Sequence, residues 1–169
     1  MSQFFPLIFV LLWSSAFITT LPIVLNSDPF SALAFRFFFV AVCFFIYSIV
    51  KKIKIKVNFS NLFNSFSTGI LFHGFYLGGV FYAIFVGLPT SIVALIVTLQ
   101  PILTNILAGY FLNEEVNIYQ WIGVVLGFTG AVMVIGFDIG STLPVKGLTA
   151  GVIALIAITT STIWQKKIS

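Results

Sequence analysis

A few polar side chains lie inside long apolar runs of the sequence, and Arg36 is the most informative of them. Arg36 lies in the apolar run Phe30–Val50, eight residues after Asp28, which is about 12 Å along a helix. A charge within an apolar span costs about 3 kcal/mol on insertion scales, so Arg36 needs a partner, water or the membrane interface. Two interpretations stay open: a structural arginine that extends to the interface or caps backbone carbonyls, and a gate or contact for an anionic substrate group.

His73 and Tyr76 form a second pair with possible chemistry. His73 is the single histidine of the chain, and Tyr76 follows it at the i+3 position of the same helix face. We expect both to line a polar cavity, together with Trp13 and Ser14 of the first apolar run. The alternatives are that His73 bonds a neighbouring helix and that the Ser14 hydroxyl bonds a carbonyl of its own helix.

Gln100 and Pro101 lie in the middle of another apolar run. A proline there removes one backbone hydrogen bond and frees a carbonyl near Val97. Such a break is tolerated in a membrane where protein or a wet cavity satisfies the freed group. The pattern therefore predicts that Gln100, Pro101 and Thr104 line a cavity, and the alternative is a kink that only shapes packing.

The remaining motifs predict packing and no catalysis. Gly74-x-x-x-Gly78 and Gly123-x-x-x-Gly127 have the spacing that lets two helices approach closely. One histidine, one cysteine and four acidic residues match no hydrolase, phosphate-loop or metalloprotease pattern. We therefore expect no catalytic residue, no metal and no cofactor.

Composition explains why these polar residues stand out. The chain of 169 residues is 60% hydrophobic and only 7% charged, whereas soluble domains carry roughly 25% charged residues. The net charge of +4 comes from lysines between and after the apolar runs, in Lys51–Lys56 and Lys166-Lys167. This placement is typical of cytoplasmic loops and not of nucleic-acid binding.

The elements that position these residues are about six transmembrane helices, since about 20 apolar residues span a bilayer. Cytoplasmic lysine loops put the N-terminus in the cytoplasm and leave only Lys146 on the outer side. The sequence thus predicts an all-α integral membrane protein in a lipid bilayer. The expected spans are Phe4–Leu25, Phe30–Val50, Thr68–Val86, Ser91–Leu112, Tyr119–Phe137 and Leu148–Trp164.

The last span resembles the first. At an offset of 145 residues, Thr159-Thr160 aligns with Ser14-Ser15. A repeat unit of five helices must insert its second copy upside down, which gives an inverted repeat. We expect residues 1–137 to form one five-helix repeat, and residues 138–169 to be a loop and the first helix of an incomplete second repeat, so that the chain is truncated.

Five sequence stretches, in this order, resemble the EamA-type permeases of the drug/metabolite transporter superfamily, and the resemblance covers the whole chain. They are Trp13-Ser14-Ser15-Ala16-Phe17, Phe35-Arg36-Phe37, His73-Gly74-Phe75-Tyr76-Leu77-Gly78-Gly79-Val80, Leu99-Gln100-Pro101-Ile102-Leu103-Thr104, and the hairpin from Leu112-Asn113-Glu114-Glu115 through Trp121-Ile122-Gly123 to Gly127-Phe128-Thr129-Gly130-Ala131.

The resemblance implies half of a ten-helix, inverted-repeat transporter plus one helix, in the bacterial cytoplasmic (inner) membrane. Family members move small organic metabolites, often outward, so the expected substrate is such a metabolite, an amino acid or related compound included. Four helices of the ten are lacking, and a second copy or a C-terminal half would have to complete the cavity. Two alternatives stay open: a non-transporting packing or regulatory partner, and an inactive fragment.

Overall fold

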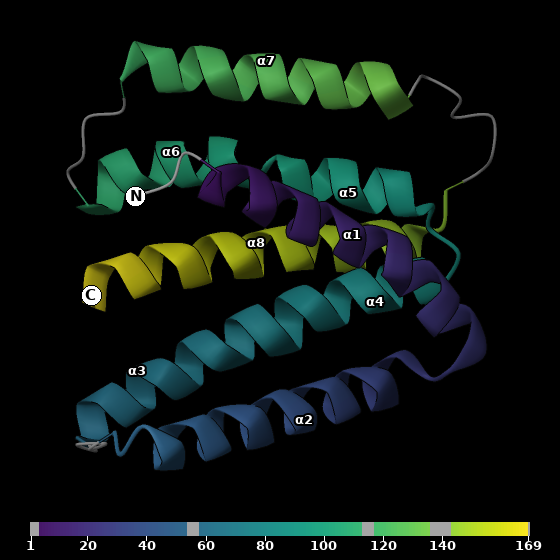
Figure 1. The fold of residues 1–169 in the computed structure, drawn as a ribbon. Coiled ribbons are helices and arrows are strands. Elements are labelled where there is room, and N and C mark those ends of the chain that lie inside the picture. The colour runs from purple at the N-terminus through teal and green to yellow at the C-terminus, as the bar shows by residue number, and fades with distance from the viewer. Residues whose placement is uncertain (1–3, 54–57, 113–116, 136–142, 169) are drawn as a thin grey trace.

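The structure, a computed structural model, describes residues 4–53, 58–112, 117–135 and 143–168, and all regular elements in these ranges are helices. Figure 1 shows them running side by side, with both chain ends at the same end of the bundle. Five helical rods are long and apolar enough to cross a membrane, and a shorter apolar helix covers Ile118–Met133. The expected all-helical membrane fold with about six spans is confirmed.

The first two spans form a hairpin whose turn is capped by an acid. α1 (Phe5–Asn26) leads into α2 (Pro29–Val50), and Asp28 lies between them. The Asp28 carboxylate accepts a hydrogen bond of 2.8 Å from the Ser31 backbone N–H, which satisfies a donor of the first helical turn. Hydrogen bonding from Ser31 lowers the pKa of the Asp28 carboxyl below its ordinary value.

The third span is one continuous rod of three segments. α3 (Phe59–Gly69) passes into η1 (Ile70–Leu77), where the backbone is wound as a π-helix, and then into α4 (Gly78–Phe85). π-helical turns are rare and frequently occur at functional sites. His73 and Tyr76, the two residues of this span that we expect to line a cavity, both lie on η1.

Two spans extend beyond their expected ends. The third begins at Phe59 and not at Thr68, because the Asn58 side-chain oxygen caps it by accepting a hydrogen bond from the Ser60 backbone N–H. The last span, α8 (Val145–Ile168), is longer at both ends than the expected Leu148–Trp164. In both cases polar residues continue the helix past the apolar run that the prediction followed.

The fourth span is broken where its proline predicts. α5 (Thr90–Thr98) ends one residue before Leu99, and α6 (Gln100–Leu112) begins one residue after it. The Leu99 backbone N–H bonds to the carbonyl of Ile96 at 3.1 Å, a tighter turn than that of an α-helix. Pro101 supplies no N–H to continue the α-helical ladder, so the interruption at Leu99 follows.

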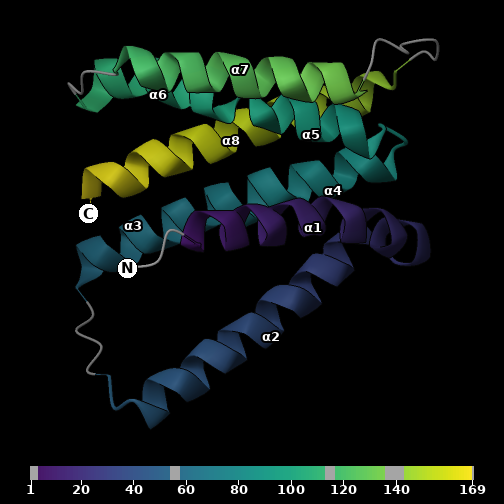
Figure 2. The ribbon, with the colours of Figure 1, turned by 45° about the horizontal axis from the view of Figure 1, so that its top comes forward.

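The short helix α7 (Ile118–Ile135) packs on α5 and α6 at the edge of the bundle, as Figure 1 shows. α8 runs through the bundle centre, between the third and fourth spans (Figures 1 and 2), and contacts η1, α4, α5 and α6. Small residues make its closest crossing. A Cβ on Gly79 of α4 would lie 2.9 Å from the Ala150 carbonyl oxygen and 3.1 Å from the Ala154 Cβ, so only glycine fits there.

Polar contacts also join α8 to α3. The buried Ser161 hydroxyl donates a hydrogen bond of 3.2 Å to the Thr68 carbonyl. The Trp164 indole N–H donates to the Asn64 side-chain oxygen at 3.4 Å. Because no water competes for such bonds in a bilayer core, they fix the register of the two helices as well as their separation.

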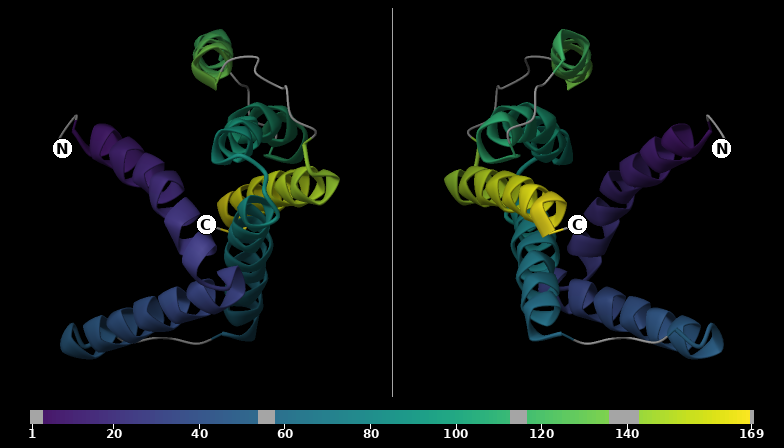
Figure 3. Two further views of the ribbon diagram at one scale, coloured as in Figure 1. Left: turned by 90° about the vertical axis from the view of Figure 1, so that its right-hand side faces the viewer. Right: turned by 90° about the vertical axis from the view of Figure 1, so that its left-hand side faces the viewer.

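α1 and α2 leave this bundle. Figure 3 shows both helices spreading away from it, and α1 touches it chiefly through α4. Their buried positions are few: Thr20 and Val24 on α1, and Pro29 and Leu33 on α2. All four lie towards the turn that joins the two helices. The hairpin is therefore attached to the bundle near its turn, and the other ends diverge.

Candidate functional site

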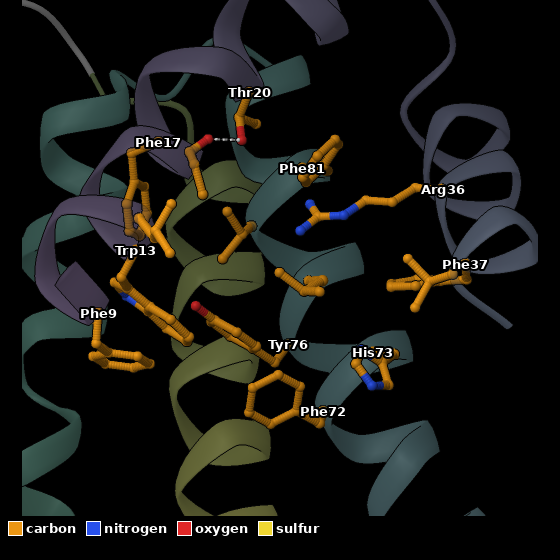
Figure 4. Close-up of a pocket in the computed structure, with 15 residues that line it drawn as sticks. Phe9, Trp13, Phe17, Thr20, Arg36, Phe37, Phe72, His73, Tyr76 and Phe81 are labelled. Atoms are coloured by element: carbon orange, nitrogen blue, oxygen red, sulfur yellow. Dashed lines mark hydrogen bonds between the residues drawn. The ribbon is translucent and has the colours of Figure 1, made fainter. Parts of the chain in front are cut away.

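A cavity of about 430 Å³ lies between α1, α2 and the third span. Phe9, Trp13, Phe17 and Thr20 follow one another at three- to four-residue intervals, so one face of α1 forms the first wall. α2 and the η1–α4 rod form the other walls (Figure 4). The lining residues are Phe9, Leu12, Trp13, Ala16, Phe17, Thr20, Arg36, Phe37, Val40, Phe72, His73, Tyr76, Leu77, Val80 and Phe81.

Aromatic rings dominate one side of this cavity. The rings of Trp13 and Tyr76 are nearly parallel, at 7°, with centroids 6.4 Å apart. Phe9 lies against Trp13 at 5.6 Å, and Phe72 meets Tyr76 edge to face at 5.3 Å. Tyr76 is only 2% exposed, so it holds the cluster to the bundle. Such a wall binds apolar or aromatic groups by shape and dispersion.

The opposite side carries the positive charge. In Figure 4 the Arg36 side chain extends from α2 towards the third span, near the side of the cavity where His73 and Phe37 lie. The His73 and Phe37 ring centroids are 4.8 Å apart. None of the residues that line this cavity is a carboxylate, and Asp28, the one acid among the described residues, lies in the hairpin turn. The guanidinium therefore favours an anionic group in the cavity.

The π-helical segment places two side chains between two cavities. Phe72 and His73 line the aromatic cavity and also a more polar one of about 550 Å³. The second cavity lies between the C-terminal half of α3, the start of η1 and the last turn of α8. Its other lining residues are Ser65, Thr68, Gly69, Gln165 and Ile168.

Trp13, Arg36, His73 and Tyr76, four of the residues singled out from the sequence, line the same cavity. Ser14 is exposed and does not belong to that lining, because one residue along a helix turns the side chain by about 100°.

The residues singled out in the fourth span lie elsewhere. The Gln100 amide donates a hydrogen bond of 3.2 Å to the Thr162 hydroxyl of α8. Pro101 lines a separate cavity of about 450 Å³ between the fourth span and α7. The Thr104 hydroxyl oxygen is buried without a hydrogen-bond partner in the described structure. The cavity-lining role of these three residues stays a prediction.

The glycines differ in what surrounds them. A Cβ on Gly74 would meet only a methyl of its own helix at 3.9 Å, and one on Gly78 would touch the Phe30 ring at 3.7 Å. Gly123 and Gly127 line the cavity between the fourth span and α7, and a Cβ on either would meet no atom within 4 Å in the described structure. The tight approaches occur instead at Gly79, Gly147 and Gly151, where a Cβ would lie 2.9, 2.8 and 3.0 Å from the nearest atom, and the x-x-x spacing did not single out these three. A packing role for the other four stays a prediction.

Most of the aromatic side chains that line the cavity are not among the residues singled out from the sequence. Phe9 and Phe17 lie four residues before and after Trp13, so the helical period around Trp13 was the available signal. Phe72 and Phe81 carried none, because 21 phenylalanines make any one of them uninformative.

The arrangement is suited to binding an amphipathic molecule. Its described lining combines an aromatic wall, the Arg36 guanidinium with no carboxylate beside it, and the hydroxyl and imidazole groups of Tyr76 and His73. Among the described residues, no group of three or more His, Cys, Asp or Glu could hold a metal ion.

Membrane-spanning helices around an amphipathic cavity define a multi-pass membrane protein that can take up a small molecule within the bilayer. The model of the EamA-like transporter family matches residues 2–136. The chain belongs to this family and is a membrane transporter of the drug/metabolite type. Comparisons with curated proteins and with solved structures gave no match.

Proposed function

We propose that the chain takes part in moving a small organic metabolite with an anionic group, such as an amino acid or a related compound, across the bacterial inner membrane. The observation that carries the proposal is Arg36 facing a cavity whose lining holds no carboxylate. A substrate carboxylate would neutralise the guanidinium, and the apolar part of the substrate would lie against the rings of Trp13, Phe72 and Tyr76.

We further propose that the substrate passes between Phe72 and His73. These two side chains line both the aromatic cavity and the polar cavity near the ends of α3 and α8. A π-helical turn holds one more residue than an α-helical turn. Rewinding η1 as α-helix would rotate Phe72 and His73 relative to α3, and that rotation would open or close the passage.

We propose that His73 and Tyr76 serve as binding groups and that the protein carries out no catalysis. Nucleophilic or acid–base catalysis requires a nucleophile or base oriented by a further group, commonly a carboxylate. Among the described residues that line the cavity there is neither a carboxylate nor a cysteine to pair with His73.

We also propose a cytoplasmic N-terminus. Lys51 and Lys52 follow α2, and Lys166 and Lys167 end α8, at the end of the bundle where α1 begins. This asymmetry favours the cytoplasmic side for that end. Reporter fusions after Lys56 and after Asp28 should report opposite sides of the membrane, and the same side for both would contradict the six-span map.

Substrate binding can be measured through Trp13. In the Trp121→Phe/Trp164→Phe variant, Trp13 is the remaining tryptophan, and it lies in the cavity wall. The purified full chain is titrated with non-aromatic amino acids and with the amine that each would give on decarboxylation. We expect saturable fluorescence changes with one or more amino acids and none with the matching amines, because only the acids carry a carboxylate for Arg36.

Two results would overturn the proposal. Amines that bind as tightly as the corresponding amino acids would remove the role of Arg36 as an anion contact. An unchanged Trp13 signal across the whole panel, in protein shown to be folded by circular dichroism, would remove the amino acids from the proposed substrates.

A further inference from the structure

Lys146 is the lysine that departs from the positive-inside pattern, and the structure places it beside a groove. It lies in the first turn of α8, at the end of the bundle opposite to Lys166 and Lys167. A cation is unfavourable at the N-terminus of a helix, where the helix dipole is already positive. No acidic residue lies in this first turn to compensate it. The two positive contributions add up and attract an anion.

The groove beside Lys146 has a volume of about 500 Å³ and lies between the start of α2, the third span and α8. Its lining is mostly apolar, and it is distinct from the aromatic cavity. Lys146, Thr149, Phe30 and Tyr82 lie near the end of the bundle that holds the α1–α2 turn, and Gly74 lies deeper in the span. The lining residues are Phe30, Gly74, Phe75, Gly78, Gly79, Tyr82, Lys146, Thr149, Ala150 and Ile153.

Glycines make this groove deep. Gly74 and Gly78 lie on one helix face, four residues apart, and a Cβ on either would meet no backbone atom of another helix within 4 Å. The Phe30 and Tyr82 rings, with centroids 6.3 Å apart, lie at the end nearer the hairpin turn. Aromatic rings are typical of the level of the lipid headgroups. The groove thus runs from the headgroup level into the hydrocarbon level.

We propose that this groove is a binding site for an anionic phospholipid, with the phosphate at Lys146 and one acyl chain along Gly74 and Gly78. Charge complementarity selects this occupant, because the groove has one cation at the headgroup level and an apolar floor below it. Acyl chains gain little from leaving other lipids for an apolar groove. The preference for one lipid over another must therefore come from the headgroup contact at Lys146.

The test is native mass spectrometry of the full chain, purified in an uncharged detergent and titrated with three dioleoyl lipids: phosphatidylglycerol, phosphatidylcholine and diacylglycerol. We expect phosphatidylglycerol to bind most tightly. Lys146→Gln should weaken it about fivefold and leave diacylglycerol unchanged. Lys167→Gln, at the other end of the same helix, is the matched control and should leave the preference intact.

A second pair of variants tests the acyl-chain seat. Gly74→Leu should lower the binding of all three lipids, since a Cβ at Gly74 meets only Ile70 at 3.9 Å and the longer side chain would fill the groove without displacing a helix. Gly123→Leu places the same side chain in the separate cavity between α7 and the fourth span, away from the groove, and should have no effect. Equal weakening by Lys146→Gln and Lys167→Gln, unchanged binding in Gly74→Leu, or a dimer that Gly74→Leu dissociates would each overturn the proposal. The last result would assign the groove to a second copy of the chain.

Discussion

α8 and α1 are both apolar helices long enough to cross a membrane, yet their surroundings are opposite. Nine residues of α8 are buried, against two of α1 in its described part. α1 is nevertheless the more hydropathic of the two. In a bilayer the solvent is itself apolar, so hydrophobicity does not decide which helix is buried. Small residues and interhelical hydrogen bonds decide it, and α8 has both.

The bundle around α8 and the α1–α2 hairpin differ in what they contribute to the cavity. The bundle around α8 is closely packed and hydrogen-bonded, and it provides a rigid support. The α1–α2 hairpin contributes Trp13 and Arg36 to the cavity but has few buried residues of its own. The third span belongs to both regions, since Tyr76 is buried in the bundle and also lines the cavity. A movement of the hairpin would therefore reshape the cavity and leave the bundle intact.

The largest effect on stability should come from adding a side chain where α4 and α8 cross closely, at Gly79. Gly79→Leu forces a side chain into the Ala150 carbonyl and should lower the free energy of unfolding by about 3 kcal/mol. Gly123→Leu adds the same side chain where a Cβ would meet no atom within 4 Å and should change it by less than about 0.5 kcal/mol. The measurement is unfolding in a series of dodecyl sulfate mixtures, followed by circular dichroism. Equal effects of the two variants would contradict the assignment of α8 as the packed centre.

Two isoleucines compare α8 and α1 directly. Ile158 of α8 is 1% exposed, whereas Ile18 of α1 is 76% exposed. Ile158→Ala should lower the free energy of unfolding by about 2 kcal/mol, the low end of the range for truncations in a protein core. The variant loses the packing contacts of the side chain, but the hydrophobic contribution is small because the solvent is lipid and not water. Ile18→Ala should cost less than about 0.5 kcal/mol. A larger loss for Ile18 in the same unfolding assay would show that α1 is packed against a partner.

A smaller effect is expected from the hydrogen bond between Gln100 and Thr162. A double-mutant cycle with Gln100→Ala and Thr162→Ala should give a coupling free energy of about 0.6 kcal/mol. Thr129→Ala is the control, because the Thr129 hydroxyl donates a hydrogen bond to the Val125 carbonyl of its own helix. Its effect on the free energy of unfolding should add to that of Gln100→Ala without coupling. Zero coupling would mean that Gln100 does not hold α8.

The smallest effect belongs to the exposed cap of α2. Asp28→Ala should destabilise the hairpin at neutral pH, because it removes the bond to the Ser31 backbone N–H. The folded pKa of this carboxyl is lowered, so its contribution is complete above the ordinary pKa of an aspartate and disappears as the pH falls through the lowered value. Unfolding curves of the two proteins should therefore converge at acidic pH, and a difference that grows with acidity would contradict this.

The sequence was sufficient for the spans and their order, because long apolar runs and the breaks at Asp28 and Pro101 are local signals. It also singled out Trp13, Arg36, His73 and Tyr76, since polar or amphipathic residues stand out in an apolar chain. It did not reveal that Gln100 turns towards α8, because that depends on a helix that comes about 60 residues later. Nor did it reveal that η1 is wound as a π-helix, because no residue type marks a π-helical turn as clearly as proline marks a helix break.

The most direct test of the account is the export of one labelled amino acid, chosen by the Trp13 titration, from cells that contain the wild-type chain, Arg36→Lys or Arg36→Ala at equal membrane levels. Hydrogen bonds to charged groups contribute about 1.5–3 kcal/mol. We therefore expect Arg36→Ala to lower export at limiting substrate at least about tenfold, and Arg36→Lys, which keeps the charge, to retain a clearly higher rate. Equal export by the wild-type chain and Arg36→Ala would contradict it.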